Sequence, residues 1–163
     1  IGKSLTENKM LNTAEKIIKE MKAKKCKLVL PQDIICADSL ANKAKTYSFS
    51  VDRCPVDKMI LDIGPMTEKN IMTIIDKSKT LIWNGPLGAF ETLPFDRGTN
   101  NIAKYAANRT LDGQLISIAG GGDTVSALKT SDSVSKFSYV STAGGAFLEW
   151  LEGKTLPGIE SLK

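Results

Sequence analysis

Histidine is absent from the 163 residues of this chain. Its absence excludes Ser-His-Asp triads, histidine metal sites and imidazole acid–base catalysis within this segment. Cysteine is scarce as well, because Cys26, Cys36 and Cys54 are widely spaced and form no C-x-x-C pair. An odd number of cysteines, each in or beside an apolar run, predicts buried free thiols in a reducing, cytoplasmic location rather than zinc binding or disulfides.

Long apolar runs are missing too. No stretch is long enough to cross a bilayer, and the first residues contain neither an initiator methionine nor a signal-peptide pattern. We therefore expect no membrane association, and we expect a segment from inside a larger protein. The net charge is only +4, and the densest basic run, 19–27, contains no aromatic residue. We interpret this run as the solvated end of a helix, so no nucleic-acid partner is expected.

Strand-like and helix-like segments alternate along the chain, whose length fits one domain with a single core. Helices are predicted at 8–24 with Thr6 as N-cap, at a segment capped by Thr67, and at 97–108, 124–129 and 143–151. Strands are predicted at 27–31 and 34–37 with a bend at Pro31, and at 47–51, 59–63, 80–83, 115–119 and 137–141. Such alternation implies parallel pairing through right-handed crossovers. The predicted class is α/β, a Rossmann-like three-layer sandwich with a mainly parallel sheet and helices on both faces.

Three of the predicted strands end in glycine-rich loops. The loops read WNGPLG from Trp83, AGGGDT from Ala119 and STAGG from Ser141. In an open parallel sheet, the loops at the carboxyl ends of the strands form the ligand crevice. Glycine lets backbone approach a ligand closely, and the amides at a helix N-terminus attract phosphate. We therefore predict a phosphate site between the helix starts at Thr124 and Gly144, although tight turns alone are the alternative for any single loop.

Asp123 adds a metal to this prediction. A carboxylate beside phosphate-binding amides repels the phosphate unless a cation lies between them, and Mg²⁺ is the usual one. Helix capping is the alternative role for Asp123. Asn84 follows a buried strand at a sharp break, so its amide is expected to face the crevice. Glu91 could bind ribose hydroxyls, or it could be a solvated loop charge.

The same loops carry a family resemblance. LIWNGPLGAFE from Leu81, GGGDT from Gly120, and VSTAGGA from Val140 followed by LEGKTLPG from Leu151 stand in one order and spacing. This set resembles the carboxyl-terminal half of phosphoglycerate kinase, and the resemblance covers nearly the whole chain. It implies a glycolytic, reversible transfer of a phosphoryl group between 1,3-bisphosphoglycerate and ADP, with magnesium, giving 3-phosphoglycerate and ATP. The intact enzyme is expected to be a monomer.

The resemblance also implies roles for individual residues. Gly64, Leu87 and Phe90 border the adenine, and Glu91 the ribose. The remaining assignments concern the phosphate end of the nucleotide: Asn84, Gly85 and Pro86 beside the nucleotide, Asp123 on Mg²⁺, Thr124 beside the phosphates, and the amides of Gly121, Gly122, Gly144 and Gly145 stabilising charge on the transferring phosphoryl group. These roles agree with chemistry that relies chiefly on positioning and charge stabilisation.

Some of the family's features are not found. Ala143 stands where the family usually has a third glycine. The amino-terminal domain that binds 3-phosphoglycerate or 1,3-bisphosphoglycerate has no counterpart here. Two features of the family's nucleotide domain are also missing: an early glycine-rich loop with its lysine, and a glycine-rich strand end near the adenine. We therefore expect the chain alone to bind ADP or ATP weakly and not to turn over. Two alternatives stay open: a non-catalytic nucleotide-binding module, and a structural α/β domain.

Overall fold

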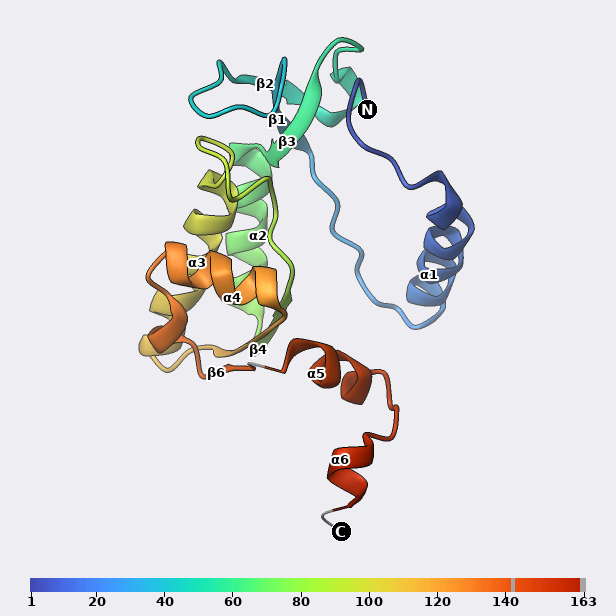
Figure 1. Cartoon of the computed structure of the whole chain (residues 1–163), viewed down its shortest axis with the longest axis vertical. Helices are drawn as coiled ribbons and strands as arrows, with labels where there is room; N and C mark the ends of the chain where they lie inside the picture. The colour runs from blue at the N-terminus through green and yellow to red at the C-terminus, as the bar shows by residue number, and fades with distance from the viewer. Residues whose placement is uncertain (142, 162–163) are drawn as a thin grey trace.

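A computed structural model describes residues 1–141 and 143–161 of the chain (Figure 1). Its strands form two three-stranded sheets. Sheet A is antiparallel, with the order β2-β1-β3 and the bounds β1 Asp33–Ala37, β2 Tyr47–Ser50 and β3 Met59–Ile63. Sheet B is parallel, with the order β4-β5-β6 and the bounds β4 Thr80–Asn84, β5 Ile116–Gly120 and β6 Tyr139–Val140.

The helices follow the strands as an α/β pattern requires. Their bounds are α1 Leu11–Ala23, α2 Pro65–Lys77, α3 Arg97–Leu111, α4 Gly122–Thr130, α5 Gly144–Leu151 and α6 Pro157–Glu160. Short 3-10 turns cover Asn8–Met10, Val51–Arg53 and Val134–Lys136. Helices α2 and α3 lie side by side, whereas α1 stands apart from the rest on two extended segments (Figure 1). In the described part of the chain, no helix has the length and apolar character to cross a membrane.

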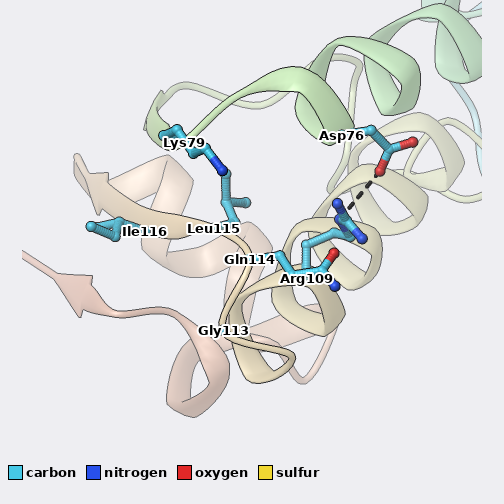
Figure 2. Close-up of a pocket in the computed structure, with 7 residues that line it drawn as sticks. All are labelled: Asp76, Lys79, Arg109, Gly113, Gln114, Leu115 and Ile116. Atoms are coloured by element: carbon cyan, nitrogen blue, oxygen red, sulfur yellow. Dashed lines mark ion pairs between the residues drawn. The ribbon is translucent and has the colours of Figure 1, made fainter.

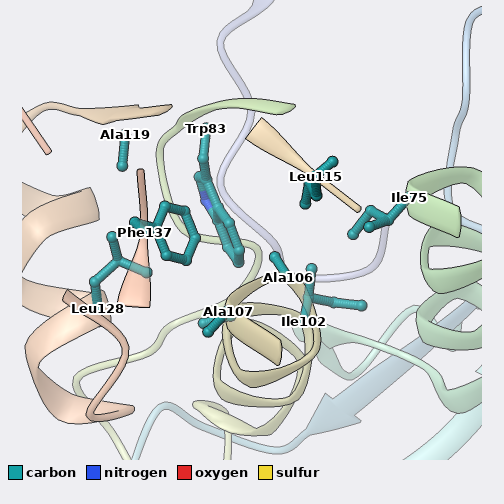
Figure 3. Close-up of a cluster of buried hydrophobic side chains, with 10 residues drawn as sticks. Ile75, Trp83, Ile102, Ala106, Ala107, Leu115, Ala119, Leu128 and Phe137 are labelled. Carbon is teal, nitrogen blue, oxygen red and sulfur yellow. The ribbon is translucent and has the colours of Figure 1, made fainter. Parts of the chain in front are cut away.

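The main hydrophobic core lies between sheet B and helices α2, α3 and α4 (Figure 3). Trp83 and Phe137 pack at its centre, with ring centroids 6.2 Å apart. Helix α3 contributes mainly small residues, so its backbone can approach the sheet closely. The buried members are Ile75, Trp83, Ile102, Ala103, Ala106, Ala107, Leu115, Ala119, Leu128 and Phe137. Each large one stabilises the fold by about 1.5–3 kcal/mol.

Asp33 links sheet A to the start of α2. Its Oδ2 accepts a hydrogen bond from the Met66 amide at 2.9 Å, and its Oδ1 accepts from the Thr67 amide at 2.8 Å and the Thr67 hydroxyl at 2.6 Å. The prediction that Thr67 caps this helix is therefore wrong. The N-cap is Gly64, Pro65 opens the helix, and a carboxylate from another strand binds the free amides.

The α/β class, with a parallel sheet flanked by helices, is confirmed, and β3 has the predicted bounds. The prediction of parallel pairing is wrong for β1, β2 and β3, which pair antiparallel. The connections between them contain no crossover α-helix, which parallel pairing would require. The predicted strand at 27–31 is wrong, because this segment has no regular secondary structure and belongs to neither sheet. Thr6 caps nothing, since α1 begins at Leu11 after a 3-10 turn. Cys26 is exposed rather than buried.

Candidate functional site

The three glycine loops meet at the carboxyl edge of sheet B. Asn84 at the end of β4 pairs with Gly120 at the end of β5, so the loops that follow these strands start side by side. The amide of Ser141 donates to the Ala119 carbonyl at 2.8 Å, which brings the third loop to the same edge. This convergence follows from parallel pairing, because parallel strands end at the same edge of a sheet.

Contacts between glycine backbone and its neighbours hold these loops together. The Gly85 amide donates to the Thr124 hydroxyl at 2.7 Å, and the Asn84 side-chain oxygen lies against Gly121. A Cβ added to Gly144 would overlap the Cα and N of Gly121, so a side chain is excluded there. Gly121 itself has φ +96°, a conformation that favours glycine. The structure therefore brings together five of the predicted site residues, each in contact with another or next to it in the sequence: Asn84, Gly85, Gly121, Thr124 and Gly144.

Two helix starts point into this cluster. Gly121 is the N-cap of the nine-residue α4, and Gly122, Asp123 and Thr124 form its first turn. Amides of a first turn have no acceptor within their own helix, and they carry the positive end of the dipole. Helix α5 begins at Gly144, against Gly121, so a second positive helix end meets the first.

A cavity of about 280 Å³ lies beside the start of α4. It is lined by Gly121, Gly122, Val125, Ser126, Lys129 and Ser141. Lys129, which was not predicted from the sequence, brings a positive charge to this cavity from two turns further along α4. Its signal in the sequence is the spacing of seven residues from Gly122, which places both on one side of a helix. The cavity thus combines free amides with a cation.

Asp123 is exposed in the first turn of α4. Among the described residues, no group of three or more His, Cys, Asp or Glu side chains could hold a metal ion. A single accessible carboxylate beside a phosphate site fits Mg²⁺, which is commonly bound by one or two carboxylates together with substrate phosphates and water. The exposed Asp123 carboxylate therefore fits a magnesium-bound phosphate chain.

Of the residues predicted to border the nucleoside, Gly64 is the N-cap of α2, whereas Leu87, Phe90 and Glu91 lie in the loop between β4 and α3. The Gly64 amide donates to the Asp33 carbonyl at 2.9 Å, and the Leu87 amide donates to the Thr99 hydroxyl at 3.0 Å. Glu91 is exposed in the loop that follows. We call the contacting residues Asn84, Gly85, Gly121, Thr124 and Gly144 the phosphate cluster. In the described ranges, no hydrogen bond joins Gly64 or Glu91 to it. The residues predicted for the phosphates therefore contact one another directly, whereas Gly64 and Glu91, predicted for the nucleoside, do not contact them through hydrogen bonds.

Phe90 and Pro86 belong to the same loop and are half-buried, as is Leu87. Gly145 is the second residue of α5 and is exposed, and a Cβ added to it would meet no atom within 4 Å. Thr142 of the third loop falls outside the described residues. Thr99 was not identified from the sequence, because a threonine in a helix gives no local sign that a loop amide will bind it.

A second cavity, of about 370 Å³, lies near the opposite end of sheet B (Figure 2). Here Asp76 accepts a hydrogen bond from the Tyr105 hydroxyl at 2.7 Å and pairs with Arg109 Nε at 3.2 Å, which joins α2 to α3. Both helices end near this cavity, so their carbonyl ends favour the cations that are already there. None of the predicted site residues lines it.

Comparisons with known proteins agree on one family. The model of the family described as phosphoglycerate kinase matches residues 1–154. The chain is 52% identical over 163 residues to the phosphoglycerate kinase of Methylorubrum populi, and 53% identical to that of Bradyrhizobium diazoefficiens. Each alignment covers all of this chain but 41% of the relative.

Solved structures give the same result. The fold is similar to phosphoglycerate kinase from Coxiella burnetii, with a TM-score of 0.90 and 42% identity, over 98% of this chain and 40% of that one. It is also similar to phosphoglycerate kinase from Pyrococcus horikoshii, with a TM-score of 0.75 and 25% identity, over 94% of this chain and 36% of that one.

Proposed function

Because the chain belongs to the phosphoglycerate kinase family, we propose that it supplies the magnesium-nucleotide site for phosphoryl transfer between 1,3-bisphosphoglycerate and ADP. The reaction is reversible and gives 3-phosphoglycerate and ATP. The observation that carries this proposal is the contact of the three glycine loops, with Gly144 packed against Gly121 and Gly85 bonded to Thr124. As a glycolytic enzyme it would act in the cytoplasm.

The glycine loops would stabilise charge rather than perform covalent chemistry. The amides of Gly121, Gly122, Gly144 and Gly145 surround the junction of α4 and α5, where the positive ends of both helices meet. Such fixed donors stabilise charge on the phosphoryl oxygens without reorganising during the reaction. Because phosphoryl transfer requires chiefly positioning and charge stabilisation, this backbone arrangement suits the proposed step.

Asp123 and Lys129 would complete the phosphate side. Bound Mg²⁺ would neutralise charge on the phosphate oxygens, with Asp123 holding it at the helix start. Lys129 faces the same cavity and would attract the phosphate chain. On the nucleoside side, Gly64, Leu87 and Phe90 would border the adenine, and Glu91 would accept hydrogen bonds from the ribose. Asn84 and Pro86 would line the path between the two sides.

The acceptor would be bound elsewhere. The chain spans 41% of the length of its curated relatives, and the phosphate cluster accounts only for the nucleotide. We therefore propose that residues beyond this chain bind 3-phosphoglycerate or 1,3-bisphosphoglycerate, and that the 163 residues alone do not turn over. A coupled assay of the purified chain that gave turnover comparable to an intact phosphoglycerate kinase would contradict this statement.

Calorimetry of nucleotide binding tests the proposal directly. Replacing Asp123 with Ala should weaken Mg-ADP binding by about tenfold, the effect of losing roughly 1.4 kcal/mol. Asp112→Ala removes an exposed carboxylate at the end of α3 and serves as the matched control, with unchanged binding expected. With ADP and a chelator instead of Mg²⁺, Asp123→Ala should bind at least as tightly as the wild type, because without the metal the carboxylate only repels the phosphates.

The alternatives make different predictions. If wild type and Asp123→Ala gave identical heats with Mg-ADP, the metal assignment would be wrong, and no binding at all would favour a structural domain whose glycines only form turns. A non-catalytic binding module would bind Mg-ADP but would not transfer phosphate after mixing with the separately prepared amino-terminal domain of a relative. Restored transfer in that mixture would support the enzyme.

A further inference from the structure

Asp62 is a buried carboxylate inside an apolar strand. It is 2% exposed and lies between Leu61 and Ile63, which are also buried, on β3. Its Oδ1 accepts a hydrogen bond from the Ile63 amide at 2.8 Å, and its Oδ2 accepts one from the Gly98 amide, also at 2.8 Å. Gly98 belongs to the first turn of α3. Both carboxylate oxygens therefore bind backbone amides, one of them 36 residues away.

The segment 88–98 closes around this carboxylate. A Cβ on Gly88 or on Gly98 would overlap Asp62, so the carboxylate fills the space that a side chain would need at both positions. The Ala89 amide donates to the Leu61 carbonyl at 2.8 Å, and the Phe95 side chain is fully buried against the same region. The segment is thus fixed to β3 at its start, by Gly88 and Ala89, and at its end, by Gly98.

We propose that Asp62 is a positioning residue for the nucleoside: it fastens the segment 88–98 to β3 and so fixes the adenine- and ribose-facing residues of that loop. The inference rests on the proposed function, because that function assigns Phe90 and Glu91 to the nucleoside. Asp62 itself is too buried to touch a ligand, so it acts through the loop. Its contribution should concern the base and sugar, not the phosphates, which the glycine loops bind independently.

The charge of Asp62 makes this attachment dependent on pH. Burial raises the pKa of Asp62 from 3.8 to about 6, against the opposing hydrogen bonds from Gly98 and Ile63, and Glu68 and Asp96 raise it further. Glu68 on α2 is partly neutralised by Arg97 at 3.5 Å and accepts a hydrogen bond from Asn101. On β1, Ile35 lies opposite Asp62, and the nearest charge on that strand, Asp33, binds the start of α2.

The direction of the pH effect follows from linkage. If the segment 88–98 opens, Asp62 becomes solvated and its pKa returns toward 3.8. The closed form therefore binds a proton more tightly than the open form, and acid favours the closed form. Between pH 7.5 and pH 5, the opening equilibrium should fall by about tenfold. This is the opposite of what a carboxylate with a lowered pKa would produce.

Amide hydrogen exchange of the whole chain, measured by NMR and corrected for intrinsic exchange rates, tests the attachment without any ligand. In the wild type, the protection of the Ala89 and Gly98 amides should rise about tenfold from pH 7.5 to pH 5. Asp62→Asn should remove this dependence. Asp96→Asn, which removes a charge from the same segment but no bond to β3, should keep most of it, because Asp96 contributes the smallest part of the raised pKa of Asp62. Protection no higher in the wild type than in Asp62→Asn would overturn the inference. If Asp62→Asn did not fold, Ala89 and Gly98 amides that exchange in the wild type as fast as exposed loop amides would overturn it.

Binding measurements test the positioning role. Asp62→Asn keeps the shape but offers one acceptor oxygen instead of two, so Mg-ADP binding should weaken roughly fivefold, as expected for one lost hydrogen bond. Binding of Mg-pyrophosphate, which has no nucleoside, should not change. Equal losses for both ligands would refute the inference, because they would indicate general damage. If the wild type bound neither ligand, the proposed function would fail, and hydrogen exchange would still decide whether Asp62 fastens the segment.

Discussion

The two sides of the candidate site are positioned by different means. On the phosphate side, the loops contact one another through glycine backbone, as where Gly144 packs against Gly121. On the nucleoside side, two buried carboxylates bind backbone amides: Asp33 at the start of α2 and Asp62 at the start of α3. Both sides should therefore be sensitive to added volume, but only the nucleoside side should also be sensitive to charge and pH.

The largest expected effect comes from adding one methyl group to the phosphate side. In Gly144→Ala the new Cβ would overlap the backbone of Gly121, which cannot rotate away as a side chain could. We expect the free energy of unfolding to fall by about 1–3 kcal/mol, as in other overpacked sites. Urea denaturation followed by Trp fluorescence measures this change.

Gly145→Ala is the matched control, because a Cβ there meets no atom within 4 Å. It lies in the same helix turn and adds the same group, so its free energy of unfolding should change by no more than about 0.5 kcal/mol. Equal destabilisation by the two substitutions would mean that helix conformation, rather than contact between the loops, controls this side.

The glycine loops were predictable because their signals are local. WNGP, GGGDT and TAGG each follow a strand-like run directly, and parallel pairing then brings their starts to one edge. The contacts that fix the nucleoside side were not predictable. Asp33 binds Thr67 across 34 residues and Asp62 binds Gly98 across 36, and no local pattern states which amide a carboxylate will reach. A charge within the apolar run MILDI was the only indication for Asp62.

The wrong strand prediction at 27–31 has a related cause. A short apolar run fits a strand, but a strand also requires a partner with free backbone groups. The segment has no regular secondary structure and belongs to neither sheet, and α1 before it has no buried residue among those described. Apolar composition alone therefore did not predict whether this segment forms a strand.

The next effect concerns Asp33. Asp33→Ala removes the acceptor for two amides and a hydroxyl at the start of α2, which should lower the free energy of unfolding by about 2 kcal/mol at pH 7. Burial would raise the pKa of Asp33, but the hydrogen bonds from Thr67 and Met66 outweigh it, so the pKa is lowered below 3.8.

The pH dependence of this effect distinguishes the two carboxylates. A lowered pKa means that the contribution of Asp33 is complete above 3.8 and is lost as the pH falls through the lower folded value. Unfolding measured from pH 7 to pH 3 should therefore show the wild type approaching Asp33→Ala only in acid. A gap that widened as the pH fell below about 6 would instead assign to Asp33 the behaviour expected of Asp62.

The smallest expected effect tests whether side-chain charge contributes to the phosphate side at all. Lys129 faces the cavity at the start of α4 but is exposed, so water and salt screen its attraction for phosphate. Lys129→Ala should weaken Mg-ADP binding only about threefold at low salt, and the difference should shrink at 0.5 M salt. Lys104→Ala removes another exposed charge, from α3 and outside the cavity lining, and should leave binding unchanged.

A loss of more than about thirtyfold for Lys129→Ala that persisted in high salt would show that a side chain, rather than backbone amides, provides the main charge stabilisation. In that case the contrast between a phosphate side built from backbone and a nucleoside side built from carboxylates would no longer hold.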